Sequence, residues 1–352
     1  MPSVGLDAAG SQPTRHWHRL DDGRVQCDLC PRACKLHEGQ RGLCFVRACV
    51  NGSIVLTTYG RSSGFCVDPI EKKPLHHFLP GTTTLSFGTA GCNLACRFCQ
   101  NWELSKARAT AILAVEATPA DIASTAARLG CPSVAFTYND PVVFHEYAIA
   151  VAQACRARDI RTVAVTAGYV NPTPRAEFYA HMDAANVDLK AFSDAFYRRV
   201  CAGRLKPVLD TLRYLAGTGV WLEITNLVIP GHNDSDDELD RMTAWVVEHL
   251  GPDVPMHFTA FHPDFRMRAV PPTTSETLRR ARAIARRNGI RHAYTGNLPD
   301  PAGATTSCHA CGAALIVRAG YVLTGYHLTA DGRCPSCATP CPGVFDVVGP
   351  RR

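Results

Sequence analysis

Between residues 82 and 297, short apolar and β-branched runs alternate with longer segments of helical periodicity. Strands of a covered parallel sheet read as nearly continuous apolar runs, whereas helices on such a sheet repeat their apolar positions every three or four residues. The predicted strands are 82–91, 133–139, 161–168, 186–192, 220–231 and 256–263, and 291–297 is one more candidate. A strand followed by a helix, six times over, predicts a parallel sheet with right-handed crossovers.

The predicted helices carry ordinary start and stop signals. In the first, Thr118 is the expected N-cap, Pro119 lies in the first turn, and Gly130 ends the helix. The others are predicted over 142–159, 206–219, 234–251 and 274–289. Six such units indicate the α/β class, specifically an incomplete (β/α)6 TIM-like barrel. In such barrels the catalytic and ligand-binding residues lie at the C-terminal ends of the strands.

Composition narrows the class of protein. The chain has 352 residues, 46% of them hydrophobic, which is enough for one large domain with small appendages. The net charge of +6 is a mild excess without a basic stripe, so nucleic acid is a poor candidate partner. No signal peptide or membrane-spanning stretch is visible, so we expect a cytoplasmic protein without a membrane partner. Since cytoplasmic thiols stay reduced, disulfides are not expected, and the tightly clustered cysteines among the 17 are expected to bind metal.

Most of these cysteines fall into three groups, which divide the chain into a cysteine-rich segment (1–80), a partial barrel (81–298) and a zinc-ribbon-like module (307–346). The groups are Cys27, Cys30, Cys34 and Cys44; Cys92, Cys96 and Cys99; and Cys308, Cys311, Cys334 and Cys337. The last group forms two CxxC pairs, which favours Zn²⁺ and leaves Cys341 spare, with an auxiliary iron–sulfur cluster as the rival. The first group admits zinc or an auxiliary [4Fe–4S] cluster, and Cys49 could replace one ligand.

The middle group has only three thiolates, in a CxxxCxxC loop just after the first strand, with Phe98 before the last cysteine. Three thiolates can hold three irons of a cubane cluster and leave the fourth iron open to a small molecule. This loop resembles the CxxxCxΦC motif of radical S-adenosylmethionine (radical SAM) enzymes. The stretches 68–81, 91–105, 137–141, 187–192 and 257–265 resemble the AmmeMemoRadiSam system radical SAM enzymes, a branch similar to pyruvate formate-lyase activating enzymes.

The resemblance covers residues 27–345 and implies a [4Fe–4S] cluster and S-adenosylmethionine as cofactors. One electron from the cluster would cleave S-adenosylmethionine, and the 5′-deoxyadenosyl radical would remove hydrogen from a substrate. A protein or peptide substrate is expected, with Memo-like and AMMECR1-like partners by resemblance and a flavodoxin or ferredoxin as electron donor. Glycyl-radical enzyme activation and RNA modification are alternatives within the enzyme class. A non-catalytic metal-binding interaction module is the alternative outside it.

Candidate cofactor contacts stand at successive strand ends, beside Phe98 in the cluster loop. Relatives often have a Gly-Gly-Glu-type motif that binds the amine of S-adenosylmethionine, and this chain has Asn139 and Asp140 at that place. Both side chains can accept hydrogen bonds from an ammonium group. Asp140 would also suit the N-cap of the following helix. The remaining candidates are Thr166 for a carboxylate or ribose oxygen, Asp188 for ribose hydroxyls, Lys190 for the carboxylate, and Val228 and Ile229 along adenine.

Four further expectations concern residues outside these motifs. One of His76 and His77 is expected to face the cluster or its cofactor. The end of the sixth strand should place His257, His262 and Asp264 near the substrate mouth, although a structural role is the simpler interpretation for each histidine taken singly. Cys201, beside basic residues, is a candidate reactive thiol. Finally, the Pro- and Gly-containing stretch 298–307 reads as a linker, so the module after it is expected near the barrel mouth, where it would grip the substrate.

Overall fold

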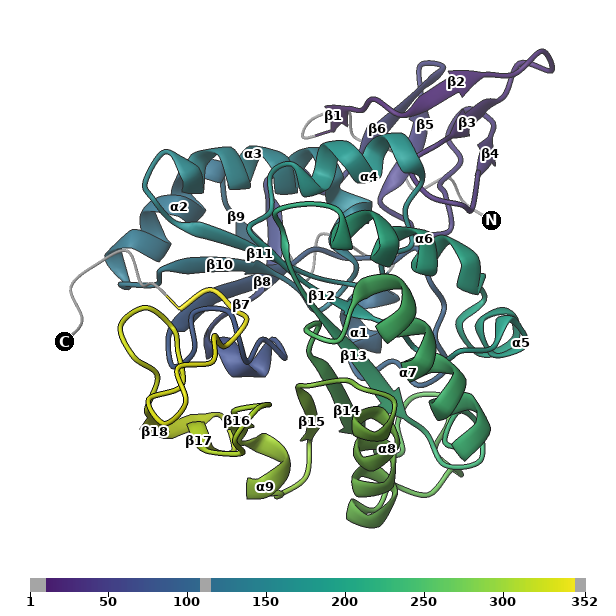
Figure 1. Cartoon of the computed structure of the whole chain (residues 1–352). Coiled ribbons are helices and arrows are strands. Elements are labelled where there is room, and N and C mark those ends of the chain that lie inside the picture. The colour runs from purple at the N-terminus through teal and green to yellow at the C-terminus, as the bar shows by residue number, and fades with distance from the viewer. Residues whose placement is uncertain (1–10, 108–114, 346–352) are drawn as a thin grey trace.

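A nine-stranded sheet forms the centre of the computed structural model, which describes residues 11–107 and 115–345 (Figure 1). Seven neighbouring strands run parallel, and two antiparallel strands, β7 and β9, extend one edge. In sheet order the strands are β15 (Ala293–Gly296), β14 (Met256–Ala260), β13 (Trp221–Val228), β12 (Ala184–Asp188), β11 (Arg161–Thr166), β10 (Ser133–Phe136), β8 (Thr83–Gly88), β7 (Arg61–Pro69) and β9 (Val115–Glu116). The predicted α/β fold with a parallel sheet is confirmed, and the candidate strand at 291–297 is present as β15.

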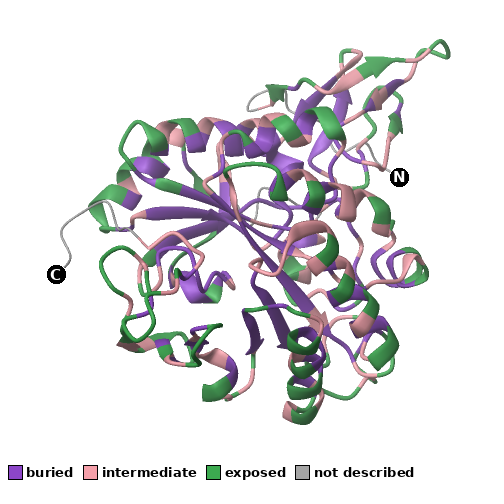
Figure 2. Cartoon of the chain, viewed as in Figure 1, coloured by how far each residue is buried: buried purple, intermediate pink, exposed green. Residues whose placement is uncertain are grey.

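Helices cover the outer face of this sheet, and the strands beneath them are buried along most of their length (Figure 2). The longer helices are α2 (Pro119–Arg128), α3 (His145–Arg156), α4 (Pro172–Tyr179), α6 (Leu205–Ala216), α7 (Asp236–Leu250) and α8 (Ser275–Arg287). Shorter turns are η1 (Ile70–Lys72), α1 (Trp102–Ser105), η2 (Pro141–Phe144), α5 (Asp194–Phe196), η3 (Tyr197–Cys201) and α9 (Pro301–Ala304). Thr118 caps α2 as predicted, in a reciprocal capping box with Asp121. None of the helices in the described ranges is both long and apolar enough to cross a bilayer.

Small sheets surround the two terminal cysteine groups. The N-terminal strands are β1 (Gln12–Pro13), β2 (Trp17–Arg19), β3 (Val25–Cys27), β4 (Lys35–Leu36), β5 (Arg47–Val50) and β6 (Ser53–Leu56). The C-terminal strands are β16 (Thr306–Ser307), β17 (Ala314–Ala319) and β18 (Val322–Tyr326). The first ten residues and residue 346, which the sequence assigns to these modules, lie outside the described residues.

The C-terminal module packs under the barrel floor, and the expectation that it lies near the mouth is wrong. Residues 70–81 fill the floor, because their apolar side chains pack on Ala135, Val163 and Ala184 near the starts of three strands. The module binds this segment: Val344 N–H donates to His77 O at 2.7 Å, and Leu79 N–H donates to Val344 O at 2.7 Å.

The stretch 298–307 explains this position, because it is not an extended linker. It contains α9 and β16, and it turns the chain back along β15. The hydroxyl groups of Thr306 and Tyr294 therefore share a hydrogen bond of 2.8 Å near the start of β15. Beneath them, the buried Arg318 lies 3.6 Å from the buried carboxylate of Glu71 and donates to His76 O at 2.7 Å.

Candidate active site

Cys92, Cys96 and Cys99 lie on the loop after β8 and line one cavity of about 290 Å³. This cavity is at the C-terminal ends of the parallel strands, where barrels place their chemistry. Two glycines set the path of the loop. A Cβ on Gly88 would lie 2.4 Å from Thr137 O, and Gly91 has a φ of +84° with no room for a side chain.

The spacing of these three thiols fits a cluster better than a single ion. Around one zinc, with Zn–S bonds of about 2.3 Å, tetrahedral sulfur atoms lie roughly 3.8 Å apart. Among the described residues, several groups of ligand atoms gather within 4.8 Å of one another, but the three loop cysteines do not form such a group. The wider spread, together with a shared cavity, suits the corners of a cubane with one open iron.

The protein surrounds the loop thiols with hydrogen bonds and charge. Burial raises the pKa of Cys92 to about 12, whereas a hydrogen bond with Cys201 lowers the pKa of Cys96 to about 7. Cys99 Sγ lies 3.2 Å from the hydroxyl of Ser105. Cys201 is fully buried against Cys96, so it lies behind the loop and does not line the cavity.

Asn139, Asp140 and Thr166 all line the cavity, but their polar groups already have protein partners. Asn139 Nδ2 donates to Gly91 O at 2.7 Å, and its Oδ1 accepts from Thr89 N–H at 3.1 Å. Asp140 accepts from Thr166 Oγ1 at 3.1 Å and from the N–H groups of Val142 and Ala167 at 3.0 Å. These hydrogen bonds fix the positions of the cluster loop and of two strand ends. Direct contact of Asn139, Asp140 and Thr166 with the cofactor stays a prediction.

Asp188 and Lys190 also line the cavity, as their alternation along β12 and beyond predicts. Lys190 Nζ donates to Asp188 Oδ2 at 2.9 Å and lies 5.7 Å from the ring centre of Phe98, another lining residue. Burial opposes the charge of Lys190, but Asp188 and the thiol of Cys96 raise its pKa well above the ordinary value. The pair thus offers an anionic and a cationic group beside the cluster loop.

The cavity wall on β13 differs from the sequence expectation. Glu223, Thr225 and Leu227 alternate toward the barrel interior, so Leu227 lines the cavity, whereas Val228 and Ile229 are fully buried outside it. The sequence analysis missed Thr225. Its hydroxyl is buried and has no hydrogen-bond partner among the described residues, so it is available to a bound ligand. Two polar residues two positions apart in an otherwise largely apolar strand, Glu223 and Thr225, were the available signal.

Other lining residues that the sequence analysis missed come from the strand ends and the floor segment. They include Lys72, Pro74, Gln100, Asn101, Tyr138, Thr259 and Asn297. Just beyond Asn101, Trp102 stacks on Phe265 with ring centres 5.4 Å apart and planes inclined by 10°. This stack joins the cluster loop to the loop after β14. Both aromatic residues lie in stretches that carry the family resemblance, which was the signal for them.

His76, His77 and His257 do not line the cavity. The expectation that His76 or His77 faces the cluster or its cofactor is therefore wrong, whereas the simpler, structural interpretation of His257 is confirmed. The N–H groups of His76 and His77 donate to the buried carboxylate of Glu223, at 3.0 and 2.8 Å. His257 Nε2 lies 2.6 Å from the same carboxylate, because it is near the start of β14 and not at its end. Burial lowers the pKa of His77 to about 4. These residues build the barrel floor.

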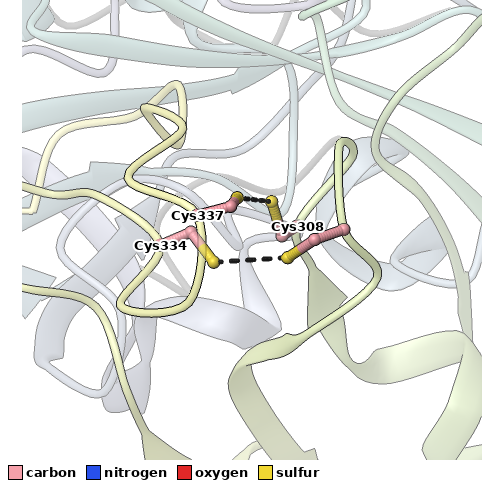
Figure 3. A group of neighbouring side chains, drawn as sticks. Cys308, Cys334 and Cys337 are labelled. Atoms are coloured by element: carbon pink, nitrogen blue, oxygen red, sulfur yellow. Dashed lines mark hydrogen bonds between the residues drawn. The ribbon is translucent and has the colours of Figure 1, made fainter.

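The two terminal cysteine groups differ in geometry. All four C-terminal sulfur atoms lie within 4.8 Å of one another, with Cys308–Cys337 and Cys311–Cys334 at 3.5 and 3.6 Å. Figure 3 shows the labelled side chains of this group pointing toward one another. These spacings match a tetrahedral zinc site. The N-terminal cysteines instead line a second, separate cavity, with their sulfur atoms further apart.

Comparisons with known proteins agree with this geometry. The radical SAM superfamily profile matches residues 87–243. The chain is 38% identical over 332 residues to an uncharacterized protein, MJ0808, of Methanocaldococcus jannaschii, covering 94% of this chain and 98% of the relative. It is 22% identical over 225 residues to the pyruvate formate-lyase 1-activating enzyme of Escherichia coli K12, covering 60% and 91%.

Solved structures show weaker similarity. A domain of the pyruvate formate-lyase-activating enzyme of Bacteroides vulgatus is 16% identical with a TM-score of 0.42, covering 47% of this chain and 98% of that one. Streptococcus suis SuiB bound to precursor peptide SuiA is also 16% identical, with a TM-score of 0.48 and coverage of 65% and 51%. With the near full-length relative, the matching profile and the three-cysteine cavity at the strand ends, the chain belongs to the radical SAM superfamily.

Proposed function

We propose that this chain is a radical SAM enzyme of the AmmeMemoRadiSam type that removes hydrogen from a protein or peptide substrate. The observation that carries the proposal is one cavity shared by Cys92, Cys96 and Cys99, the Asp188–Lys190 pair and the unpartnered hydroxyl of Thr225. When bound there, a [4Fe–4S] cluster supplies the electron that cleaves the carbon–sulfur bond of S-adenosylmethionine.

The residues of this chain would orient the cofactor and keep water from it. Lys190 would pair with its carboxylate, and Asp188 would accept hydrogen bonds from its ribose hydroxyls. Asn139 holds the cluster loop by its bonds to Thr89 and Gly91, so the loop stays in place whether or not the site is filled. The floor segment closes the opposite end of the barrel, which leaves the mouth as the route for the substrate.

A macromolecular substrate is favoured by the activating-enzyme relatives, which by their names act on another enzyme. The Trp102–Phe265 stack beside the cavity also gives a partner an aromatic surface next to the reacting site. Memo-like and AMMECR1-like proteins are the first candidates for this partner. Activation of a glycyl-radical enzyme is the narrower version of the same chemistry, and the same relatives favour it.

Anaerobic reconstitution tests the chemistry. With dithionite, the protein should convert S-adenosylmethionine to methionine and 5′-deoxyadenosine, and Cys96→Ala should reduce this product to background. Cys66→Ser is the matched control, because Cys66 is exposed on β7 and does not line the cavity. Undiminished product from Cys96→Ala would refute the proposal.

The substrate class is tested with purified candidate partners. A partner labelled with deuterium should pass deuterium to 5′-deoxyadenosine and change mass in the presence of S-adenosylmethionine and reductant. A stable glycyl-radical signal in the partner would identify the narrower reaction. Product without deuterium from every protein and peptide tested, but with deuterium from RNA, would overturn the proposed substrate class.

A further inference from the structure

The N-terminal cysteines Cys27, Cys30, Cys34 and Cys44 line a cavity of their own, with the cluster loop as one wall. Cys27 and Cys30 are 7% and 9% exposed, whereas Cys34 and Cys44 are half-buried, so the site is partly closed to water. Asn93, which follows the cluster ligand Cys92, lines the same cavity. A four-cysteine site therefore lies directly behind the three-cysteine loop.

Backbone N–H groups point at three of these sulfur atoms. The N–H groups of Leu29 and Arg32 donate to the sulfur atoms of Cys27 and Cys30, and the N–H groups of Val46 and Arg47 donate to Cys44. Tight turns aim these donors, with Ala33 and Phe45 at φ values of +46° and +71°. Burial raises the pKa of all three thiols, and the backbone donors act against this effect. The same donors would hold the sulfur atoms in place for a bound metal centre.

Two arginines add positive charge at the same cavity. Arg47 is 1% exposed; it pairs with Glu146, and its charge also acts on Cys27 and Cys44. The Nη2 group of Arg32 is buried and finds no partner among the described residues, although its Nε donates to Asn93 O at 2.9 Å. A buried guanidinium nitrogen without a hydrogen-bond partner, beside four thiols, favours an anionic group in this cavity.

The spread of the sulfur atoms argues against a zinc ion here. In the described part of the chain, the C-terminal cysteines gather within 4.8 Å, but no three of the N-terminal sulfur atoms do. They share this openness with Cys92, Cys96 and Cys99. A single tetrahedral ion needs sulfur separations of roughly 3.8 Å, whereas the irons of a cubane hold their thiolates further apart.

Cys49, the alternative fourth ligand, is turned away from the cavity. Its thiol donates to Glu38 Oε2 at 3.6 Å, and it does not line the site. The ligand set is therefore complete with four cysteines. Because no iron is left open, this site cannot chelate S-adenosylmethionine as the other one would.

We propose that Cys27, Cys30, Cys34 and Cys44 hold a second [4Fe–4S] cluster that relays electrons to the one on the loop. A flavodoxin- or ferredoxin-type donor loses one electron to this second cluster, which then returns to its oxidised state by reducing the loop cluster by one electron. The contact between the sites is short, since a Cβ on Gly91 would lie 2.0 Å from Cys44 O. The cluster itself does not depend on the proposed function; only the relay does.

Metal analysis tests the cluster independently of catalysis. A Cys92→Ala, Cys96→Ala and Cys99→Ala triple variant, reconstituted anaerobically, should keep about four iron and four sulfide per chain. Adding Cys27→Ala and Cys30→Ala should remove them, whereas adding Cys49→Ser should not. If the triple variant does not fold, the wild-type protein should hold about eight iron, and a Cys34→Ala and Cys44→Ala variant about four. Two zinc per chain and iron only on the loop would overturn the proposal.

The relay is tested by comparing two reductants on the Cys34→Ala and Cys44→Ala variant. Dithionite is small and can reach the loop cluster directly, so cleavage of S-adenosylmethionine should stay within about twofold of wild type. Cleavage driven by reduced flavodoxin should fall by about tenfold or more. Equal losses with both reductants, or no loss with either, would refute the relay while leaving the cluster measurement to stand by itself.

Discussion

The Asp188–Lys190 pair gives the sharpest test of how this site holds its cofactor. Both side chains line the cavity, and Lys190 is also close enough to Cys96 to influence the cluster ligands. Asp188→Ala is therefore the cleaner change, because it removes a carboxylate that lines the cavity and leaves the three loop cysteines in place. Affinity for S-adenosylmethionine should fall.

The size of this loss follows from the exposure of the pair. A hydrogen bond to a charged group contributes about 1.5–3 kcal/mol, and solvent screening places a partly exposed group at the lower end. The Asp188 side chain is 35% exposed and that of Lys190 13%, so the loss should be about 1.5 kcal/mol. Since 1.4 kcal/mol corresponds to a factor of ten, the Kd should rise roughly tenfold.

Equilibrium titration of the reconstituted protein under anaerobic conditions measures this Kd, and the absorbance of the cluster confirms that the metal is retained. Asp210→Ala is the matched control. Asp210 pairs with Lys206 on α6, its side chain is 34% exposed, and it does not line the cavity. A Kd for Asp188→Ala within about twofold of wild type, with the cluster intact, would refute the assignment.

The floor and the pH profile supply two more predictions. Arg318→Met leaves the carboxylate of Glu71 buried without its charged partner, so the free energy of unfolding, measured by urea titration, should drop by about 3–5 kcal/mol. The control is Arg333→Met, which changes an exposed arginine and should lower the same quantity by less than about 0.5 kcal/mol. Equal losses for the two variants would contradict the importance of the buried pair. The pKa of His77 is lowered to about 4, below the value of about 6.5 in the unfolded chain, so the unfolded chain binds the proton first and stability should fall as pH drops from about 6.5 toward 4. His77→Gln should flatten this decline, and an unchanged slope would place the cause elsewhere.

The sequence predicted the parallel sheet because its strands are apolar on both faces and separated by capped helices. It missed α4, where Pro172 and Pro174 read as loop signals although prolines are well tolerated in the first turn of a helix. It also missed the pairing of β7 with β8, because a strand near the sheet edge with exposed residues such as Phe65 lacks the continuous apolar pattern. The pattern of apolar residues therefore predicts a strand well only where the whole strand is buried.

At the site, spacing along the chain was sufficient for the cysteine loop but not for the walls around it. Successive side chains of a strand point to opposite faces, so either Leu227 or Val228 can face the cavity, but not both. A shift of one residue in the predicted strand exchanges the two faces. The partners of Asn139 are backbone groups of Thr89 and Gly91, which no side-chain pattern encodes. The position of the C-terminal module depended on a chain reversal after Gly296, which likewise has no signature in composition.

The bonds between Val344 and the floor segment have a consequence for synthesis. His77 is translated early, yet its contact at Pro342 comes from a residue 265 positions later. A domain emerging from the ribosome can order its sheet as each strand appears, but this barrel must wait for almost all of the described chain before its base is sealed. A chain that ends before Val344 lacks the two backbone hydrogen bonds that this residue makes to the floor segment. An arrested nascent chain should therefore expose this segment to proteases that the complete chain resists.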